Sequence, residues 1–264
     1  MNKISTLRIL GYSSGTLGFA IFERVITLWL FYFYTTKQPQ YEDVLIAPVI
    51  FGVIQLTGRM LDAVSDPLVA HLSDRIRIPF GKRRIFVVCS CVPLTLSLIF
   101  LFMPSTQYPV IYAAIMLNIF YLFFTAYQIP LNSQLPALTY NNEAAKINIL
   151  SIRAIFGIVG VALVMVMSPL LLKIISFQQM ILCMSLLALA FCIIPGLFQE
   201  PQEIYVKSEK HSSLRQSLRE IFEEKKFRLF LISLMAFWFG FNIITTTTHK
   251  TLRGPRGGLI CSKQ

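Results

Sequence analysis

Apolar residues fall in seven long runs along the chain, separated by shorter polar stretches. The runs lie at about residues 10–35, 44–72, 85–104, 108–131, 147–172, 177–198 and 227–246. A helix needs about 20 mostly apolar residues to cross a bilayer, and each run has roughly that length. The pattern predicts an all-α membrane protein with a six-helix N-terminal bundle over 1–198 and a partial seventh membrane helix over 227–246.

Two polar segments flank the seventh run. Residues 199–226 mix acidic with basic side chains and place apolar residues at helical spacing, which predicts a cytoplasmic linker containing an amphipathic helix. Residues 247–264 hold four basic residues and no acidic one. A basic tail on the outer side of a seventh spanning helix would break the positive-inside rule. We therefore expect 247–264 not to be native to the fold, as after a frameshift or an early stop.

Positive charges predict the orientation. Basic residues cluster before the first run, between the second and third, and after the sixth, while the alternate connections hold few. Cytoplasmic connections of membrane proteins carry such an excess of Lys and Arg. The N-terminus is therefore predicted to lie in the cytoplasm.

Composition supports the same class. The chain is 55% hydrophobic and has a mean hydropathy of +0.64. Its net charge of +11 comes from the short connections, so the expected partner is the lipid bilayer and not nucleic acid. The chain contains no phosphate-binding loop, zinc-ligand spacing or Ser/His/Asp set, so we do not expect an enzyme.

The second run carries three charges that a membrane helix does not ordinarily tolerate. Arg59, Asp62 and Asp66 stand at i, i+3 and i+7 and so share one helix face. Two carboxylates one turn apart need a bound cation, a shared proton or the guanidinium of Arg59 between them. The alternative to an ion site is a static Arg–Asp network that holds this helix to its neighbours.

Further charges and amides lie within other runs. Glu23 and Arg24 are adjacent in the first run and point about 100° apart, so each needs its own partner. Arg153 is a candidate partner for Glu23, and Asp62 or Asp66 for Arg24. The fourth run ends in amides and hydroxyls, including Asn132, which suit either a polar solute such as a sugar or hydrogen bonds between helices.

The stretch LDAVSDPLVAHLSDRIRIPFGKRR resembles the signature of the glycoside–pentoside–hexuronide:cation symporters, the melibiose-permease branch of the major facilitator superfamily. Three other segments keep similar spacing: YFYT ending the first run, TAYQIP in the fourth and SIRAIFG entering the fifth. FNIIT in the last run resembles the start of that family's seventh helix. The resemblance covers about residues 8–245.

The resemblance implies roles for individual residues. It implies a cation site at Asp62, Asp66, Thr125 and Gln128, for a sodium ion or a proton, with no other cofactor. It implies a solute contact at Arg153, to which we add Asn132, Glu23 and Arg24 from their own chemistry. The basic turn at the end of the signature implies a cytoplasmic gating loop, whose residues are Asp74, Arg75, Gly81, Lys82, Arg83 and Arg84.

The chain also departs from the family pattern. Gln128 replaces an acid, Ala20 stands where the melibiose permease has a sugar-binding Asp, and Ala70 replaces a glycine. The family has twelve helices in two halves, so this chain is expected to supply the N-terminal half. Self-association of two copies is one way in which such a half would enclose a solute.

The resulting hypothesis is cation-coupled transport of a sugar or glycoside by a truncated chain, in a bacterial inner membrane. Two alternatives stay open. One is a non-transporting membrane protein or scaffold, and the other is a transporter of a lipid or nucleoside-like solute.

Overall fold

The computed structural model describes residues 6–37, 44–75, 82–104, 107–139 and 143–198, with scattered positions between 228 and 240. The chain divides into two units, residues 1–204 and 205–264. In the second unit the described positions, such as Arg228, Leu229 and Phe237, are helical. The linker expected over 199–226 and the tail expected over 247–264 lie outside the described residues, so both stay predictions.

The first unit is built from helices, and its described part contains no strand. The helices are α1 (Thr6–Val25), η1 (Ile26–Leu30), α2 (Phe31–Thr35), α3 (Pro48–Arg75), α4 (Lys82–Leu101), α5 (Pro109–Ser133), α6 (Leu135–Leu138), α7 (Glu143–Leu171) and α8 (Phe177–Phe198). The turn η1 is π-helical and joins α1 to α2 without a break. These bounds confirm the six helical runs expected before residue 198 to within a few residues.

Within the described ranges, four helices are long and apolar enough to cross a membrane: Leu7–Thr35, Pro109–Ser133, Glu143–Leu171 and Phe177–Leu197. Val87–Leu101 forms a shorter apolar helix. Helix α3 is 28 residues long but less apolar, because Arg59, Asp62 and Asp66 interrupt it. A helix of that length can cross a bilayer, and charges inside such a helix are rare.

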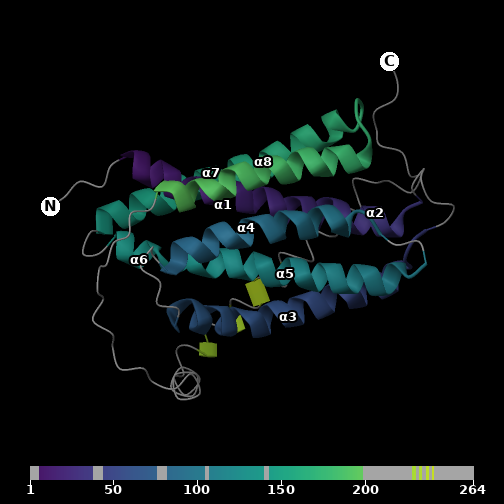
Figure 1. The fold of residues 1–264 in the computed structure, drawn as a ribbon, viewed down its shortest axis with the longest axis horizontal. Helices are drawn as coiled ribbons and strands as arrows, with labels where there is room; N and C mark the ends of the chain where they lie inside the picture. Colours follow the sequence, from purple (N-terminus) through teal and green to yellow (C-terminus); the bar gives the residue numbers. More distant parts are fainter. Residues whose placement is uncertain are drawn as a thin grey trace. The chain divides into compact units, whose positions relative to one another are not determined.

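The helices lie side by side in the order α7, α1, α8, α4, α5, α3, as contacts between neighbouring pairs show (Figure 1). Side chains also join α1 to α5, where the rings of Phe19 and Phe124 stack with centroids 4.2 Å apart. Small residues permit the closest approaches: a Cβ on Gly18 would meet Ala188 O of α8 at 2.5 Å, and one on Gly160 of α7 would meet Leu17 O at 2.8 Å. Glycines of α1 and α7 thus serve close packing between membrane helices.

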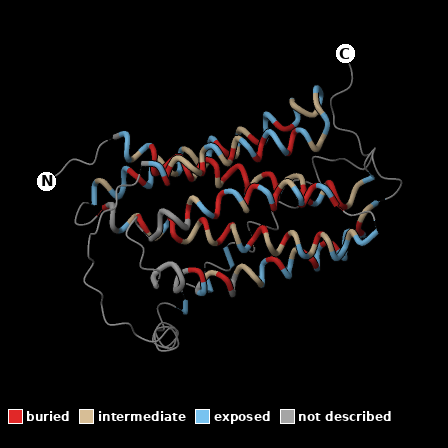
Figure 2. The backbone as a smooth tube through the Cα atoms, in the orientation of Figure 1, coloured by how far each residue is buried: buried red, intermediate tan, exposed pale blue. Residues whose placement is uncertain are grey.

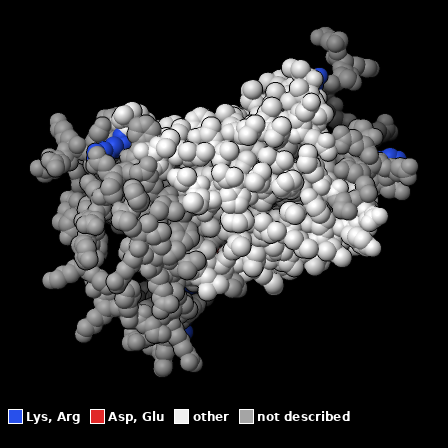
Figure 3. Space-filling view, in the orientation of Figure 1, with Lys and Arg blue, Asp and Glu red and all other residues white. Residues whose placement is uncertain are grey.

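Along each helix, buried positions alternate with exposed ones (Figure 2). Many of the exposed residues are large and apolar. On α7, for example, Ile155, Ile158 and Val166 are exposed. On the face drawn in Figure 3 the described atoms between the two ends of the helices are uncharged, and Lys and Arg appear toward the ends. An apolar band of this kind is the surface that a membrane-spanning bundle presents to lipid.

Candidate functional site

Helices α3 and α5 bring a carboxylate and a hydroxyl together inside the bundle. Thr125 Oγ1 donates a hydrogen bond of 2.6 Å to Asp62 Oδ1, and Thr125 is fully buried. Asp66 lies one turn further along α3, within electrostatic range of Asp62. Three of the four residues expected in the cation site therefore lie together.

A glycine one turn earlier explains how the two helices come so close. The ring of Tyr121 packs directly on Gly58, where an added Cβ would lie 2.7 Å from ring carbons Cδ2 and Cε2. Asp62 and Thr125 each follow four residues later, so the same helix faces meet again one turn on. The contact between Gly58 and Tyr121 thus sets the register that places Thr125 on Asp62.

Arg59 holds the other oxygen of Asp62 loosely. Its Nη1 lies 3.8 Å from Asp62 Oδ2, and the Arg59 side chain is 60% exposed against 23% for Asp62. The guanidinium carbon also sits 5.1 Å from the centre of the Tyr121 ring, a cation–π contact. The three charges expected to share one face of α3 do so, with Arg59 as a partial counter-ion.

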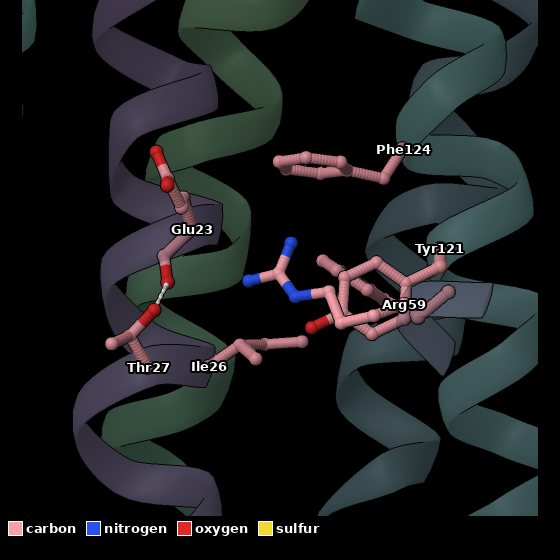
Figure 4. Close-up of a pocket in the computed structure, with 7 residues that line it drawn as sticks. Glu23, Ile26, Thr27, Arg59, Tyr121 and Phe124 are labelled. Atoms are coloured by element: carbon pink, nitrogen blue, oxygen red, sulfur yellow. Dashed lines mark hydrogen bonds between the residues drawn. The ribbon is translucent and has the colours of Figure 1, made fainter. Parts of the chain in front are cut away.

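A small cavity lies between this cluster and α1. Its volume is about 20 Å³, and Glu23, Ile26 and Thr27 form one wall, with Arg59 and the rings of Phe120, Tyr121 and Phe124 opposite. Such a space holds about one water molecule. Figure 4 shows the Arg59 guanidinium extending from α3 toward α1 across this space.

A second polar cluster joins α1, α5 and α7 around Arg153. The guanidinium donates from Nη2 to Asn132 Oδ1 (2.6 Å), from Nε to Thr16 Oγ1 (2.9 Å) and from Nη1 to the Tyr12 hydroxyl (3.4 Å). Tyr12 in turn donates to the carbonyl of Leu131 at 2.8 Å. Arg153 and Asn132, both expected to contact solute, are therefore direct neighbours.

The partners expected for two arginines are wrong. Arg153 pairs with hydroxyls and an amide, not with Glu23, because it lies level with Tyr12 and Thr16 of α1. Glu23 lies about 10 Å further along that helix than Thr16. Arg24 was expected to meet Asp62 or Asp66, yet among the described atoms its Nε is buried without a hydrogen-bond partner. Since Glu23 faces the cavity, its neighbour Arg24 points about 100° away from the aspartates.

Two groups of expected residues gain no support from contacts. Gln128 is half-buried one turn beyond Thr125, and in the described part of α3 neither aspartate accepts a hydrogen bond from it. In the expected gating loop, Gly81 lies outside the described residues. The backbone of Asp74 and Arg75 ends α3, and that of Lys82, Arg83 and Arg84 opens α4.

Several residues at these clusters were not expected from the sequence, namely Tyr12, Thr16, Gly58 and Tyr121. A signal for two of them exists, since Gly58 and Tyr121 each precede an expected site residue by four positions on the same helix face. Nothing comparable marks Tyr12 and Thr16, which become partners only once α1 lies beside α7.

Known proteins resemble this chain over most of its length. A family model described as "MFS/sugar transport protein" matches residues 11–248. Over 240 residues the chain is 28% identical to the inner membrane symporter YicJ of Escherichia coli (strain K12). This match covers 86% of this chain and 49% of YicJ. Over 134 residues it is 29% identical to the putative glycoside/cation symporter YagG of the same strain, 49% of this chain and 28% of that protein.

The chain thus spans about half the length, or less, of the symporters that it matches. A much shorter match is also present: 23 residues, 9% of this chain and 6% of the other protein, are 78% identical to serine hydroxymethyltransferase 4 of Colwellia psychrerythraea (strain 34H / ATCC BAA-681). So short a segment is far smaller than an enzyme domain.

Proposed function

This chain belongs to the MFS/sugar transport protein family, and from that premise we propose that it takes part in cation-coupled transport of a small solute of the sugar class. The observation that carries the proposal is the 2.6 Å hydrogen bond between Thr125 and Asp62 beside Asp66, inside the bundle. Paired acids within a membrane helix mark ion or proton pathways by default.

Membership of the family confirms three expectations from the sequence. The chain is a transporter-family protein and not an enzyme, it is a multi-pass membrane protein, and its fold is the all-α fold of the major facilitator superfamily. The resemblance to the symporter family is confirmed as well, at low identity.

In the proposed mechanism Asp62, Asp66 and Thr125 bind the coupling ion, a sodium ion or a proton. Carboxylate and hydroxyl oxygens are hard ligands suited to an alkali cation. A monovalent ion between the two carboxylates offsets their repulsion, which favours the bound state. Gln128 is proposed as a further ligand that contributes a neutral oxygen.

We propose that the solute lies between the two polar clusters, where Arg153 and Asn132 stand on one side and Glu23 on the other. Phe19 and Phe124 stack between them, and an aromatic face suits a sugar ring. Arg24 remains a proposed contact. By analogy with its relative YicJ, we propose the inner membrane of a bacterium as the location, with the N-terminus and the loop between α3 and α4 in the cytoplasm.

Uptake in membrane vesicles tests this function. Vesicles containing the full chain should accumulate a labelled glycoside when an inward sodium or proton gradient is imposed, and the Asp62→Asn variant should lose that dependence. Glu143→Gln, at the start of α7 and away from the site, is the control and should behave as the wild type. Absence of any solute flux would support a non-transporting membrane protein, and unchanged coupling in Asp62→Asn would show that the assigned ion site is wrong.

A further inference from the structure

We propose that Glu23 is a second carboxylate partner for Arg59, so that the guanidinium passes from Asp62 to Glu23 when a monovalent cation occupies the site at Asp62 and Asp66. Glu23 would then act as a positioning residue that links the cation site on α3 to α1. The proposal rests on the cation site proposed above and adds a role for Glu23 that differs from solute contact.

The first step is that Arg59 is held only weakly. Its distance of 3.8 Å from Asp62 Oδ2 is too long for a hydrogen bond, and its side chain is 60% exposed. The guanidinium rests on the face of Tyr121, 5.1 Å from the ring centre. A flat aromatic face allows a guanidinium to shift sideways while it keeps the cation–π attraction.

The second step is that the exposed Glu23 lies across the cavity from Arg59 with a carboxylate that has no partner there. In Figure 4 this carboxylate points along α1, away from the guanidinium, so the pairing requires the Glu23 side chain to turn toward Arg59. Both residues line the cavity of about 20 Å³, and Figure 4 shows the guanidinium directed toward α1. The backbone carbonyl of Glu23 accepts a 2.8 Å hydrogen bond from Thr27 Oγ1, whereas among the described residues its carboxylate makes no hydrogen bond or ion pair. A carboxylate at membrane depth gains from a cationic partner.

The third step is the charge balance on α3. Without a bound cation, the guanidinium is attracted to Asp62, and Asp66, one turn further along α3, adds a second negative charge to that side of the cavity. A bound monovalent cation neutralises that excess and repels the guanidinium. Both the ion and Arg59 bind the Asp62 carboxylate, so an ion that contacts Oδ2 competes with Arg59 for that oxygen.

The consequence is a movement between helices. Arg59 belongs to α3 and Glu23 to α1, so their pairing draws α1 toward α3 and closes the cavity between them. Cation binding would in this way change the wall against which a solute packs.

A double-mutant cycle on the purified full chain in detergent tests the proposal. The measured quantity is the rise in unfolding temperature on replacing choline chloride by sodium chloride at constant ionic strength, because an ion that binds the folded state stabilises it. Glu23→Gln should weaken the apparent sodium affinity about fivefold, the effect of losing one partly exposed ion pair. Glu23→Asp should restore part of it, and Glu143→Gln should leave it unchanged.

The decisive arm uses Arg59→Gln as background. There Glu23→Gln should have no further effect on sodium affinity, because its partner is gone. A merely structural role of Glu23 would instead shift the unfolding temperature equally in both salts.

The outcomes separate this inference from the proposed function. Suppose that sodium stabilises the wild type but Glu23→Gln leaves the sodium affinity unchanged, or lowers it equally with and without Arg59→Gln. Glu23 is then not the partner of Arg59, and the cation site stands. If sodium does not stabilise the wild type at all, both the sodium site and this inference are overturned.

Discussion

Two arginines inside the same bundle are held in opposite ways. Arg153 donates hydrogen bonds to three side chains on α1 and α5, at 2.6, 2.9 and 3.4 Å. Arg59 has one carboxylate at 3.8 Å and an aromatic face. The first has neutral partners at fixed positions, and the second has a charged partner that it does not fully engage.

The difference in their contacts indicates different roles for the two arginines. A guanidinium with three directed bonds fixes the relative positions of α1, α5 and α7, as interhelical hydrogen bonds do in membranes. A guanidinium beside a carboxylate that it does not fully engage responds to anything that changes the charge of that carboxylate. We therefore infer that Arg153 mainly stabilises the packing of the helices, whereas Arg59 responds to ion binding.

The largest loss of stability is expected for Arg153→Met. Interhelical hydrogen bonds in membrane proteins average about 0.6 kcal/mol, so losing three should lower the free energy of unfolding by about 2 kcal/mol. Arg153→Lys should recover little, since an ammonium cannot reproduce the planar donor geometry. Denaturation in mixed detergent micelles measures both variants, and full stability in Arg153→Met would contradict the structural role.

A smaller loss is expected for Gly58→Ala. The new methyl group would lie 2.7 Å from the Tyr121 ring, and overpacking of this kind costs about 1–3 kcal/mol. The helix preference of alanine offsets up to about 1 kcal/mol of that. Gly52→Ala is the matched control on α3, because nothing lies within 4 Å of its Cβ position.

The two glycine variants should therefore move stability in opposite directions, and the same unfolding measurement compares them. Gly58→Ala should also weaken sodium binding, since it separates Asp62 from Thr125. Equal effects at the two positions would show that the contact with Tyr121 does not set the register of α3 and α5.

The smallest effect on stability is expected for Arg59→Met. A partly exposed ion pair contributes at most about 1 kcal/mol, and the long distance places this one at the lower end. Its effect should appear in ion affinity instead, which sodium titration followed by unfolding temperature would reveal. A loss of stability as large as that of Arg153→Met would contradict the contrast between the two arginines.

The sequence predicts single helices well and contacts between helices poorly. The fourth run, expected at 108–131, is Pro109–Ser133, because apolar length and flanking polar residues are local properties. Arg59, Asp62 and Asp66 were placed on one face by periodicity alone. Thr125 was added by family resemblance, and its hydrogen bond to Asp62 agrees with that placement.

The wrong predictions concerned which side chains of different helices are partners. Partners depend on the depth and register of the helices relative to one another, and the sequence of a single helix does not determine these. Arg153 was given Glu23 as a partner by charge alone, although Tyr12, Thr16 and Asn132 lie at its level. Register between α3 and α5 depends on a close approach at Gly58 that becomes apparent only when both helices are placed.

The central claim is that Asp62, Asp66 and Thr125 form a site for a coupling ion. Equilibrium binding of radioactive sodium to the purified chain, compared between wild type, Asp62→Asn and Thr125→Val, tests it most directly. With sodium as the coupling ion, the account predicts saturable binding to the wild type and none to Asp62→Asn. Thr125→Val should bind at least about tenfold more weakly, on the order of one lost hydrogen bond to a charged group. Equal sodium binding by all three proteins would contradict it.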